Sequence, residues 1–436
     1  MEAIDNIKSI VSKHVVYLKN KDLIDAFLNQ MNTTRNIDFQ NEKGDTLIGI
    51  YCSLLSTKKE DKYIYGKKES DEMMLELLDF PFDMNIPNRI GVTPFADLCF
   101  HKFYKSAMFC ITHAGRLRTI TTFSIPNRKT PIFYCCMTDD HLYDEIYNNT
   151  QGTNDIKSTV ANDALIESMS NWMYIVNELC KIGLKIDGDN FINCLITPTV
   201  DYNATPMFLI SKILYDLNDL ENSHFIEAMY NVLNHMLRIT GPRINISLKT
   251  REEHNLSTLD YILMLEHDQN DDFIDSLINI YGPQYIAEGL TYPASLSKMV
   301  HWCISKILKI KRGTEDRYRI YIELLMSLRG RFGEIDKDNL IEMLTLFSDA
   351  PNGESYVGKS ILGSIFTLLN EIYDKYQEDI KEKKAQAAIN RLATPMYHAN
   401  SNARRSGGAS KGSTKTRRSK KSRRSKKSKR SKRKNV

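Results

Sequence analysis

The sequence lacks the short patterns that mark the common catalytic and metal sites. It contains no G-x-S-x-G nucleophile elbow, no protein-kinase signature and no dinucleotide-binding fingerprint. Its 8 cysteines include no C-x-x-C pair, and its 10 histidines include no H-E-x-x-H or H-x-E pair, so the usual spacings of zinc ligands are missing. We therefore assign no metal and no cofactor, and we interpret the cysteines as reduced packing residues.

Long apolar runs are also missing. No stretch contains eighteen apolar residues in a row, and residues 1–21 lack the uninterrupted apolar core and small-residue cleavage site of a secretory signal. The content of hydrophobic residues is nevertheless 42%, which is enough for a sizeable core. These features favour a soluble intracellular protein that does not enter a membrane.

Acidic residues are absent from one end of the chain. Residues 401–436 contain 17 Lys and Arg and no acid, so residues 1–400 carry a net charge of −12 although the whole chain carries +5. Serines alternate with basic pairs in residues 417–434, and no aromatic residue interrupts them. Such a segment has nothing to bury and its like charges repel, so we expect a disordered basic tail over residues 396–436.

Three interpretations of this tail stay open: a nuclear-import address, a polyanion contact, and a segment that folds back onto the acidic body. Any nucleic-acid binding should be independent of sequence and sensitive to salt, because the tail has no aromatic ring to stack on bases. The candidate contact residues are Arg417, Arg418, Lys420, Lys421, Arg423, Arg424, Lys426, Lys427, Lys429 and Arg430. The candidate phosphorylation sites, which would weaken polyanion binding by adding negative charge, are Ser419, Ser422, Ser425, Ser428 and Ser431.

The sequence does contain a recurring helix start. Thr-Pro followed by an apolar run occurs at Thr93, Thr130 and Thr205, and related openings occur at Thr46 and Thr258. A Thr hydroxyl caps the exposed amides of a helix, and Pro suits the first helical position because it has no amide to satisfy. Each opening therefore predicts the start of a short helix.

The positions after each Thr predict the inward face of that helix. The residue five positions on is apolar or aromatic in every opening: Tyr51, Leu98, Cys135, Ile210 and Leu263. The residue two positions on is apolar in four openings, at Ile48, Phe95, Ile132 and Met207, and Asp260 is the exception.

These openings resemble the ankyrin repeat, whose unit is a turn or hairpin followed by two antiparallel helices and whose signature is G-x-T-P-L-H-x-A. Departures are clear, because the family's His is absent and its Gly two positions before the Thr is present only at Gly44 and Gly91, not at Arg128, Asn203 or Leu256. Intervals between openings are 47, 37, 75 and 53 residues, against a family period of about 33.

The resemblance covers roughly residues 20–390 and implies an all-α, ankyrin-like helical solenoid with short turns or hairpins. We expect this degenerate repeat domain to span residues 1–395 and the basic tail to span residues 396–436. Another α-helical solenoid and a helical protein without repeats are the alternatives.

Degenerate repeats joined to a Ser/Lys/Arg tail look like the ankyrin proteins encoded by giant DNA viruses. That resemblance implies a non-enzymatic scaffold for protein–protein interaction, in the cytoplasm or nucleus of a host cell. Its partners would be an unknown protein and, through the tail, nucleic acid. A host-directed adaptor of the ubiquitin-ligase type is the alternative.

An ankyrin-like stack would bind its partner with the hairpin tips and the concave face of the first helices. Two tips have similar sequences, and their polar residues are the candidate partner-binding residues: Asn88, Arg89, Asn127, Arg128 and Lys129. The competing interpretation is that Asn favours turns and that Arg and Lys are simply solvated.

Residues 353–360, GESYVGKS, match the phosphate-binding pattern G-x-x-x-x-G-K-[ST]. A phosphate loop needs a buried strand running directly into its first Gly, but here the polar turn SDAPN comes before it. In the repeat register Ser360 takes the Thr position, and Leu362 and Ile365 take the inward positions. We therefore predict a helix start and no ATP binding, and a P-loop nucleotide hydrolase is the disfavoured alternative.

Overall fold

The computed structural model of the chain is all-α. It describes residues 2–14, 21–56, 58–59, 62–63, 67–113, 115–137, 156–216, 223–251, 255–265, 268–309, 315–349 and 359–403. The chain divides into two compact units, Met1–Tyr373 and Asp374–Val436. No helix in the part of the chain that the structure describes is long and apolar enough to cross a bilayer.

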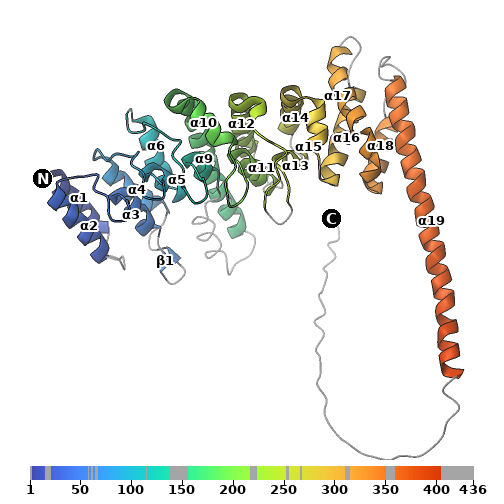
Figure 1. The fold of residues 1–436 in the computed structure, drawn as a ribbon, viewed down its shortest axis with the longest axis horizontal. Helices are drawn as coiled ribbons and strands as arrows, with labels where there is room; N and C mark the ends of the chain where they lie inside the picture. Colours follow the sequence, from blue (N-terminus) through green and yellow to red (C-terminus); the bar gives the residue numbers. More distant parts are fainter. Residues whose placement is uncertain are drawn as a thin grey trace, which may run out of the picture. The chain divides into compact units, whose positions relative to one another are not determined.

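The first unit is built of successive helices (Figure 1). In chain order they are α1 (Glu2–His14), α2 (Lys21–Thr34), α3 (Leu47–Leu55), α4 (Lys67–Leu78), α5 (Pro94–Phe100), α6 (Tyr104–Thr112), α7 (Pro131–Cys136), α9 (Ile156–Asp187), α10 (Asp189–Ile196), α11 (Pro206–Asp216), α12 (Ser223–Thr240), α13 (Thr258–Leu263), α14 (Asp268–Tyr281), α15 (Pro283–Gly289), α16 (Pro293–Lys309), α17 (Glu315–Leu328) and α18 (Lys337–Asp349). Two 3₁₀ helices, η2 (Gly241–Arg243) and η3 (Arg329–Glu334), follow α12 and α17.

Two short strands and one long helix complete the described elements. Strands β1 (Lys58–Lys59) and β2 (Lys62–Tyr63) pair antiparallel after α3. Helix α19 (Lys359–Ala403) begins in the first unit and continues into the second. The boundary expected between residues 395 and 396 therefore falls inside α19, because Pro395 removes one backbone donor without ending the helix.

The helices of the first unit form two layers in a repeat-like order. In one layer α3, α5, α7, α11, α13, α16 and α18 pack side by side in that order. In the other layer α4, α6, α9, α12, α14, α15 and α17 do the same. Helices of the two layers alternate along the chain, apart from α10 and α15, so each neighbour in space is also close in sequence.

Helix starts in the first layer follow the predicted plan. The hydroxyls of Thr46, Thr93, Thr130 and Thr205 accept a hydrogen bond from the backbone N–H three residues on, at 3.4, 3.2, 3.4 and 3.3 Å. Proline occupies the first helical position after Thr93, Thr130 and Thr205. These four helix starts are confirmed.

The fifth start differs from the prediction by one residue. Ser257, not Thr258, is the cap of α13: its Oγ accepts from the Asp260 N–H at 3.2 Å, and Asp260 Oδ2 accepts from the Ser257 N–H at 3.0 Å. This reciprocal capping box is possible only when the acid lies three residues after the cap. The inward positions then become Leu259 and Ile262, which are both fully buried, and Asp260 is no longer an exception.

The loop before each cap, which we call a tip, turns through a residue with positive φ two positions before the cap. The tips are residues 41–45, 88–92, 123–129 and 199–204, and residues 250–251 with 255–256. The φ angles are 79° at Gly44, 85° at Gly91, 58° at Arg128, 53° at Asn203 and 51° at Asn255. The left-handed conformation is thus kept where the glycine is lost, and asparagine, which tolerates it best after glycine, supplies two of the three replacements. At Gly91 no residue with a side chain fits, because a Cβ there would lie 2.3 Å from the Phe123 carbonyl oxygen.

Backbone hydrogen bonds join successive tips. The carbonyl three positions before each cap accepts from the next tip: Lys43 O from Arg89 N at 3.1 Å, Ile90 O from Ile125 N at 2.7 Å, Asn127 O from Val200 N at 3.0 Å and Tyr202 O from Arg251 N at 3.0 Å. Each of these carbonyls immediately precedes a left-handed residue. The tips therefore form a continuous row along one edge of the stack.

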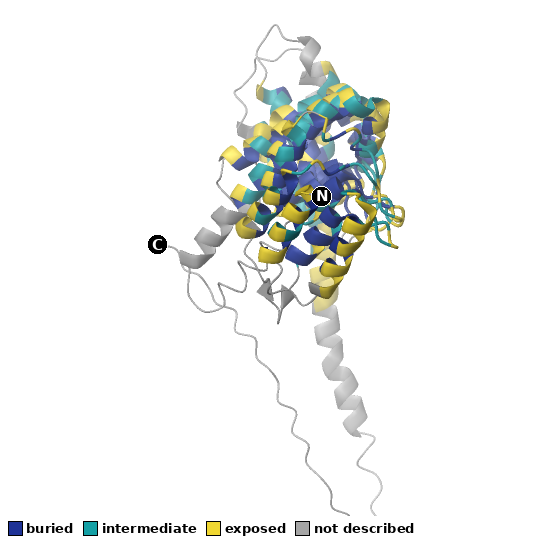
Figure 2. Cartoon of the chain, turned by 90° about the vertical axis from the view of Figure 1, so that its left-hand side faces the viewer, coloured by how far each residue is buried: buried dark blue, intermediate teal, exposed yellow. Residues whose placement is uncertain are grey.

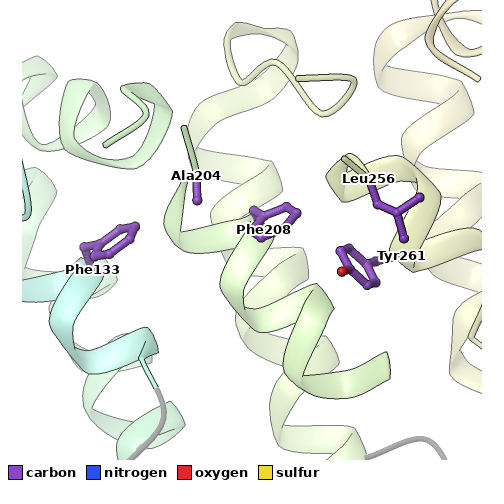
Figure 3. Close-up of a cluster of buried hydrophobic side chains, with 5 residues drawn as sticks. All are labelled: Phe133, Ala204, Phe208, Leu256 and Tyr261. Atoms are coloured by element: carbon purple, nitrogen blue, oxygen red, sulfur yellow. The ribbon is translucent and has the colours of Figure 1, made fainter. Parts of the chain in front are cut away.

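The core runs from one helical pair to the next. Figure 2 shows buried positions between the helices and exposed positions on their outer faces. One cluster joins Phe133 of α7, Ala204 and Phe208 around the start of α11, and Leu256 and Tyr261 around the start of α13 (Figure 3). The Phe208 and Tyr261 rings meet edge to face with centroids 5.4 Å apart, so the layer is held by packing across three successive helix starts.

A buried lysine connects α5 to α7. Lys102 has a φ of 63° and ends α5 in a left-handed conformation, with Phe103 N–H donating to Leu98 O at 3.0 Å as in a Schellman ending. Its side chain is 5% exposed. Its Nζ donates to the carbonyl oxygens of Tyr134, Cys135 and Met137 at 2.6, 3.2 and 2.7 Å, so one ammonium group satisfies the carbonyls at the end of α7.

Lys102→Met is expected to lower the free energy of unfolding by about 2–3 kcal/mol, because the buried carbonyls at the end of α7 would lose their donor. Urea denaturation followed by circular dichroism measures the loss. Lys105→Met, at an exposed lysine three residues away, should change the same quantity by about 0.5 kcal/mol or less. Equal losses in the two variants would show that the cap of α7 is unimportant.

Candidate functional site

A row of exposed apolar side chains lies on three adjoining tips. We call Ile90, Phe123, Ile125, Val200 and Tyr202 the tip strip; their exposed fractions are 49%, 48%, 65%, 47% and 44%. Single exposed apolar residues are ordinary on protein surfaces, but a contiguous group marks a surface that contacts something else.

The backbone explains why these side chains are neighbours. Ile125 N–H donates to Ile90 O at 2.7 Å, and Val200 N–H donates to Asn127 O at 3.0 Å. A Cβ placed on Gly91 would lie 3.5 Å from Ile125 Cγ1 and closer still to the backbone of Phe123. The tip strip is therefore built on one hydrogen-bonded row and is not a chance gathering of flexible loops.

Two of the predicted partner-binding residues, Asn88 and Asn127, form hydrogen bonds that stabilise the tips. Asn88 Oδ1 accepts from the Ile90 and Val92 N–H groups at 3.1 and 2.9 Å, and its amide donates to Asp45 Oδ1 at 2.9 Å. Asn127 Oδ1 accepts from Ser124 Oγ at 2.6 Å. Both side chains thus hold the turn conformation, as Asn commonly does.

A third predicted residue, Lys129, is 8% exposed. Its Nζ lies 2.8 Å from Asp201 Oδ2 and 4.8 Å from the centroid of the Tyr202 ring, so it joins two tips. Burial would raise the pKa of Asp201, but the hydrogen bond and positive charge of Lys129 outweigh it, and the pKa lies below its usual value.

The remaining two predicted residues, Arg89 and Arg128, are exposed beside the tip strip. Neither guanidinium has an ion-pair partner among the described residues. Arginine is one of the residues that anchor protein partners most strongly. The structure therefore leaves these two side chains, and not Asn88, Asn127 or Lys129, available at the surface.

A groove of about 480 Å³ lies next to the tip strip, between the first two tips and helices α3, α5 and α7. Its lining includes Ile90 of the tip strip, the exposed ring of Phe100 and the carboxylate of Asp97. Asp97 lies four residues after the cap Thr93, so the cap that starts α5 also turns this carboxylate toward the groove.

Asp97 is electrostatically unusual. Its carboxylate accepts no hydrogen bond and forms no ion pair within the described part of the chain, and the residue is partly buried. Desolvation, with a further contribution from the negative charge of Asp45, raises the pKa of Asp97 to about 7. A carboxyl group that is kept without a partner in a groove is a candidate binding group.

Sequence reasoning did not identify the tip strip or Asp97, although part of the signal is present. Turns are normally polar, so isoleucine in NRIG and the apolar residues of TVDYN are out of place there unless they bind something. Asp97 gives no such signal, because an acid in the first turn of a helix is ordinary.

Several predictions from the sequence concern residues that the structure does not describe. Residues 404–436, with the basic and phosphorylation candidates of the tail, lie outside the described residues, as do residues 353–358 of the GESYVGKS segment. Helix α19 begins at Lys359, so Ser360, which was predicted to precede the helix as its cap, lies inside it, and α19 is 45 residues long and not a short first helix. Among the described residues no group of three or more His, Cys, Asp or Glu side chains is placed to hold a metal ion.

No protein-family model matches the chain, and no curated protein matches it either. The functional argument therefore rests on the residues of this chain.

Asp97→Asn is expected to stabilise the fold at alkaline pH. The pKa of Asp97 is raised above its unfolded value, so the stability contributed by the protonated carboxyl is present below about pH 4 and lost as the pH rises through about 7. Asparagine removes this loss, so the free energy of unfolding should rise by about 1–3 kcal/mol at pH 8 and change little at pH 4.

Asp201→Asn provides a control of opposite sign, because the pKa of Asp201 is lowered by Lys129. This variant should lose stability at pH 8. Urea denaturation at the two pH values measures both changes, and an Asp97→Asn protein that is less stable at pH 8 than the parent chain would contradict the assignment.

Proposed function

We propose that this chain is a non-enzymatic protein–protein interaction scaffold of the ankyrin-repeat type, which binds a protein partner through the tip strip. The observation that carries the proposal is the row of five exposed apolar side chains on three tips that are hydrogen-bonded to one another.

The repeat type is supported by local geometry that recurs with the predicted openings. A hydroxyl cap, a left-handed residue two positions earlier and a carbonyl that bonds to the next tip recur together at Thr46, Thr93, Thr130 and Thr205. Each such opening leads into a helix of the first layer, and a helix of the second layer follows. This is the order of turn, first helix and second helix that the ankyrin resemblance implies.

The chemistry of the strip favours binding over catalysis. Tyrosine and arginine are among the residues that contribute most to protein–protein affinity, and the strip places Tyr202 and two arginines beside apolar side chains that a partner can cover. The backbone of the strip is held by hydrogen bonds and by the side chains of Asn88 and Asn127, so little conformational entropy is lost on association.

The second part of the proposal concerns the basic tail. Its 17 basic residues and lack of acid support contact with nucleic acid or direction to the nucleus of a host cell. A chain of this composition would neutralise phosphates without reading bases, so the tail would add affinity for nucleic acid while the tip strip selects the protein partner.

Ile125→Asp should abolish partner binding, because it places a charge at the most exposed position of the tip strip. Affinity capture with the full chain, followed by quantitative mass spectrometry, should show proteins whose recovery falls at least tenfold relative to the parent chain. Met326→Asp, which changes an exposed apolar residue of α17, is the matched control and should retain them. Recovery that is equal for both variants would refute the assignment of the tip strip.

Deletion of residues 401–436 tests the tail. The parent chain should be retained on immobilised duplex DNA at low ionic strength and released steeply as salt increases, because binding displaces condensed counterions. The truncated chain should elute without retention, since residues 1–400 carry a net charge of −12. If the truncated chain is still retained on the DNA, the tail is not the nucleic-acid contact and this part of the proposal is wrong.

A further inference from the structure

The Asp97 groove has one feature that the tip strip does not explain. A binding surface made of apolar side chains gains nothing from a partly buried carboxylate, because a neutral partner that covered the acid would remove its remaining water and leave it unpaired at a cost. A partner that fills the groove must therefore place a positive charge or a strong hydrogen-bond donor beside the Asp97 carboxylate.

Space beside the carboxylate is kept open by the neighbouring helix. Gly49 of α3 faces Asp97, and a Cβ at Gly49 would lie 2.7 Å from Asp97 Oδ2. Any other residue at position 49 would press on this oxygen and displace the carboxylate. A helix interior normally favours Ala over Gly by about 1 kcal/mol, so the glycine preserves the position of the acid at the expense of helix stability.

Aromatic rings form the wall of the groove near the acid. The Phe100 and Tyr134 rings, which both line it, meet edge to face with centroids 5.2 Å apart. Phe100 is 49% exposed, so one face of this pair can receive a further group. A planar cation can stack on such a ring while it pairs with a carboxylate nearby.

The other charged and titratable groups that line the groove are few. Asp45 adds negative charge and accepts from the amide of Asn88, Lys43 is exposed on the first tip, and His101 follows α5. The described lining thus contains two carboxylates and one lysine, and only the Asp97 carboxylate lacks a donor among the described residues.

We propose that the Asp97 groove binds an arginine side chain of the partner, with the guanidinium paired to Asp97 and stacked on Phe100. The inference rests on the proposed interaction function and names the chemistry of the partner at that surface. Arginine fits better than a metal ion, because hard cations need six or more oxygen ligands. It fits better than lysine, because only the guanidinium is planar and can both stack and form a fork of donors.

Random-sequence peptides displayed on phage and selected on the full chain provide the test. The selected peptides should share an arginine next to apolar residues. Replacing that arginine by citrulline, a neutral group of the same shape, should weaken binding to the parent chain at least tenfold, and replacing it by lysine should weaken binding less. On Asp97→Asn the citrulline and arginine peptides should bind equally, because the pairing that distinguishes them is gone.

Two further variants make the test specific to the acid. Gly49→Ala, which crowds Asp97 Oδ2 from the neighbouring helix, should weaken the arginine peptides while thermal melting shows an intact fold. Glu42→Gln, which removes an exposed acid from the first tip, should leave the affinity for the arginine peptides unchanged.

Selected peptides without a basic residue, arginine peptides that bind Asp97→Asn as well as the parent chain, or a selection that yields no peptide would each overturn the arginine site. Peptides that lose binding on Ile125→Asp but keep it on Asp97→Asn would overturn the arginine site and leave the tip strip as the interaction surface. The two proposals therefore fail in distinguishable ways.

Discussion

Hydrogen bonds between successive tips are the constraint on which the rest of the first unit depends. A carbonyl that precedes a left-handed residue can point along the stack and meet the N–H of the next tip, as Ile90 O meets Ile125 N. The same turn delivers the chain to a capped helix start, so one local conformation sets both the spacing of the helices and the alignment of the tips. The exposed side chains of the tip strip become neighbours only because this backbone row holds them, and the groove beside Asp97 lies between two such tips and helices α3, α5 and α7.

Buried charges divide into those that the fold satisfies and the one that it leaves for something else. Lys102 donates to three carbonyls at the end of α7, and Lys129 pairs with Asp201 across two tips. Each joins neighbouring units of the stack, and the cost of burial is offset by several hydrogen bonds. Asp97 is only partly buried and has no described donor, and desolvation raises its pKa. A contrast of this kind within one layer of helices separates structural charges from a binding group.

Much of the helical framework could be predicted from the sequence, because helix caps are local. Thr46, Thr93, Thr130 and Thr205 begin helices where expected, since the hydroxyl and the amide that it accepts from are three residues apart in any protein. The error at Thr258 came from choosing between two adjacent hydroxyl residues, and the acid at Asp260, which appeared to break the pattern, identifies Ser257 as the cap. The tips at Arg128, Asn203 and Asn255 adopt the glycine conformation without glycine, so the loss of glycine at these positions leaves the turn of the backbone unchanged. Asn88 and Asn127 were candidates for binding because they recur, but they recur to build the turn, and Lys129 pairs with Asp201 of the next tip.

The sequence by itself determined the local structure: which residues cap helices, which faces of the helices are apolar, and that positive charge is concentrated at one end of the chain. These properties depend on neighbours within a few residues, so spacing alone reveals them. Only the tertiary structure decided which side chains share a surface. Ile90, Ile125 and Val200 are separated by 35 and 75 residues along the chain and meet through backbone bonds between tips, while Asp97 and Gly49 face each other from different helices. No periodicity encodes such pairs, because the distance between them is set by how helices pack and not by the spacing of residues along the chain.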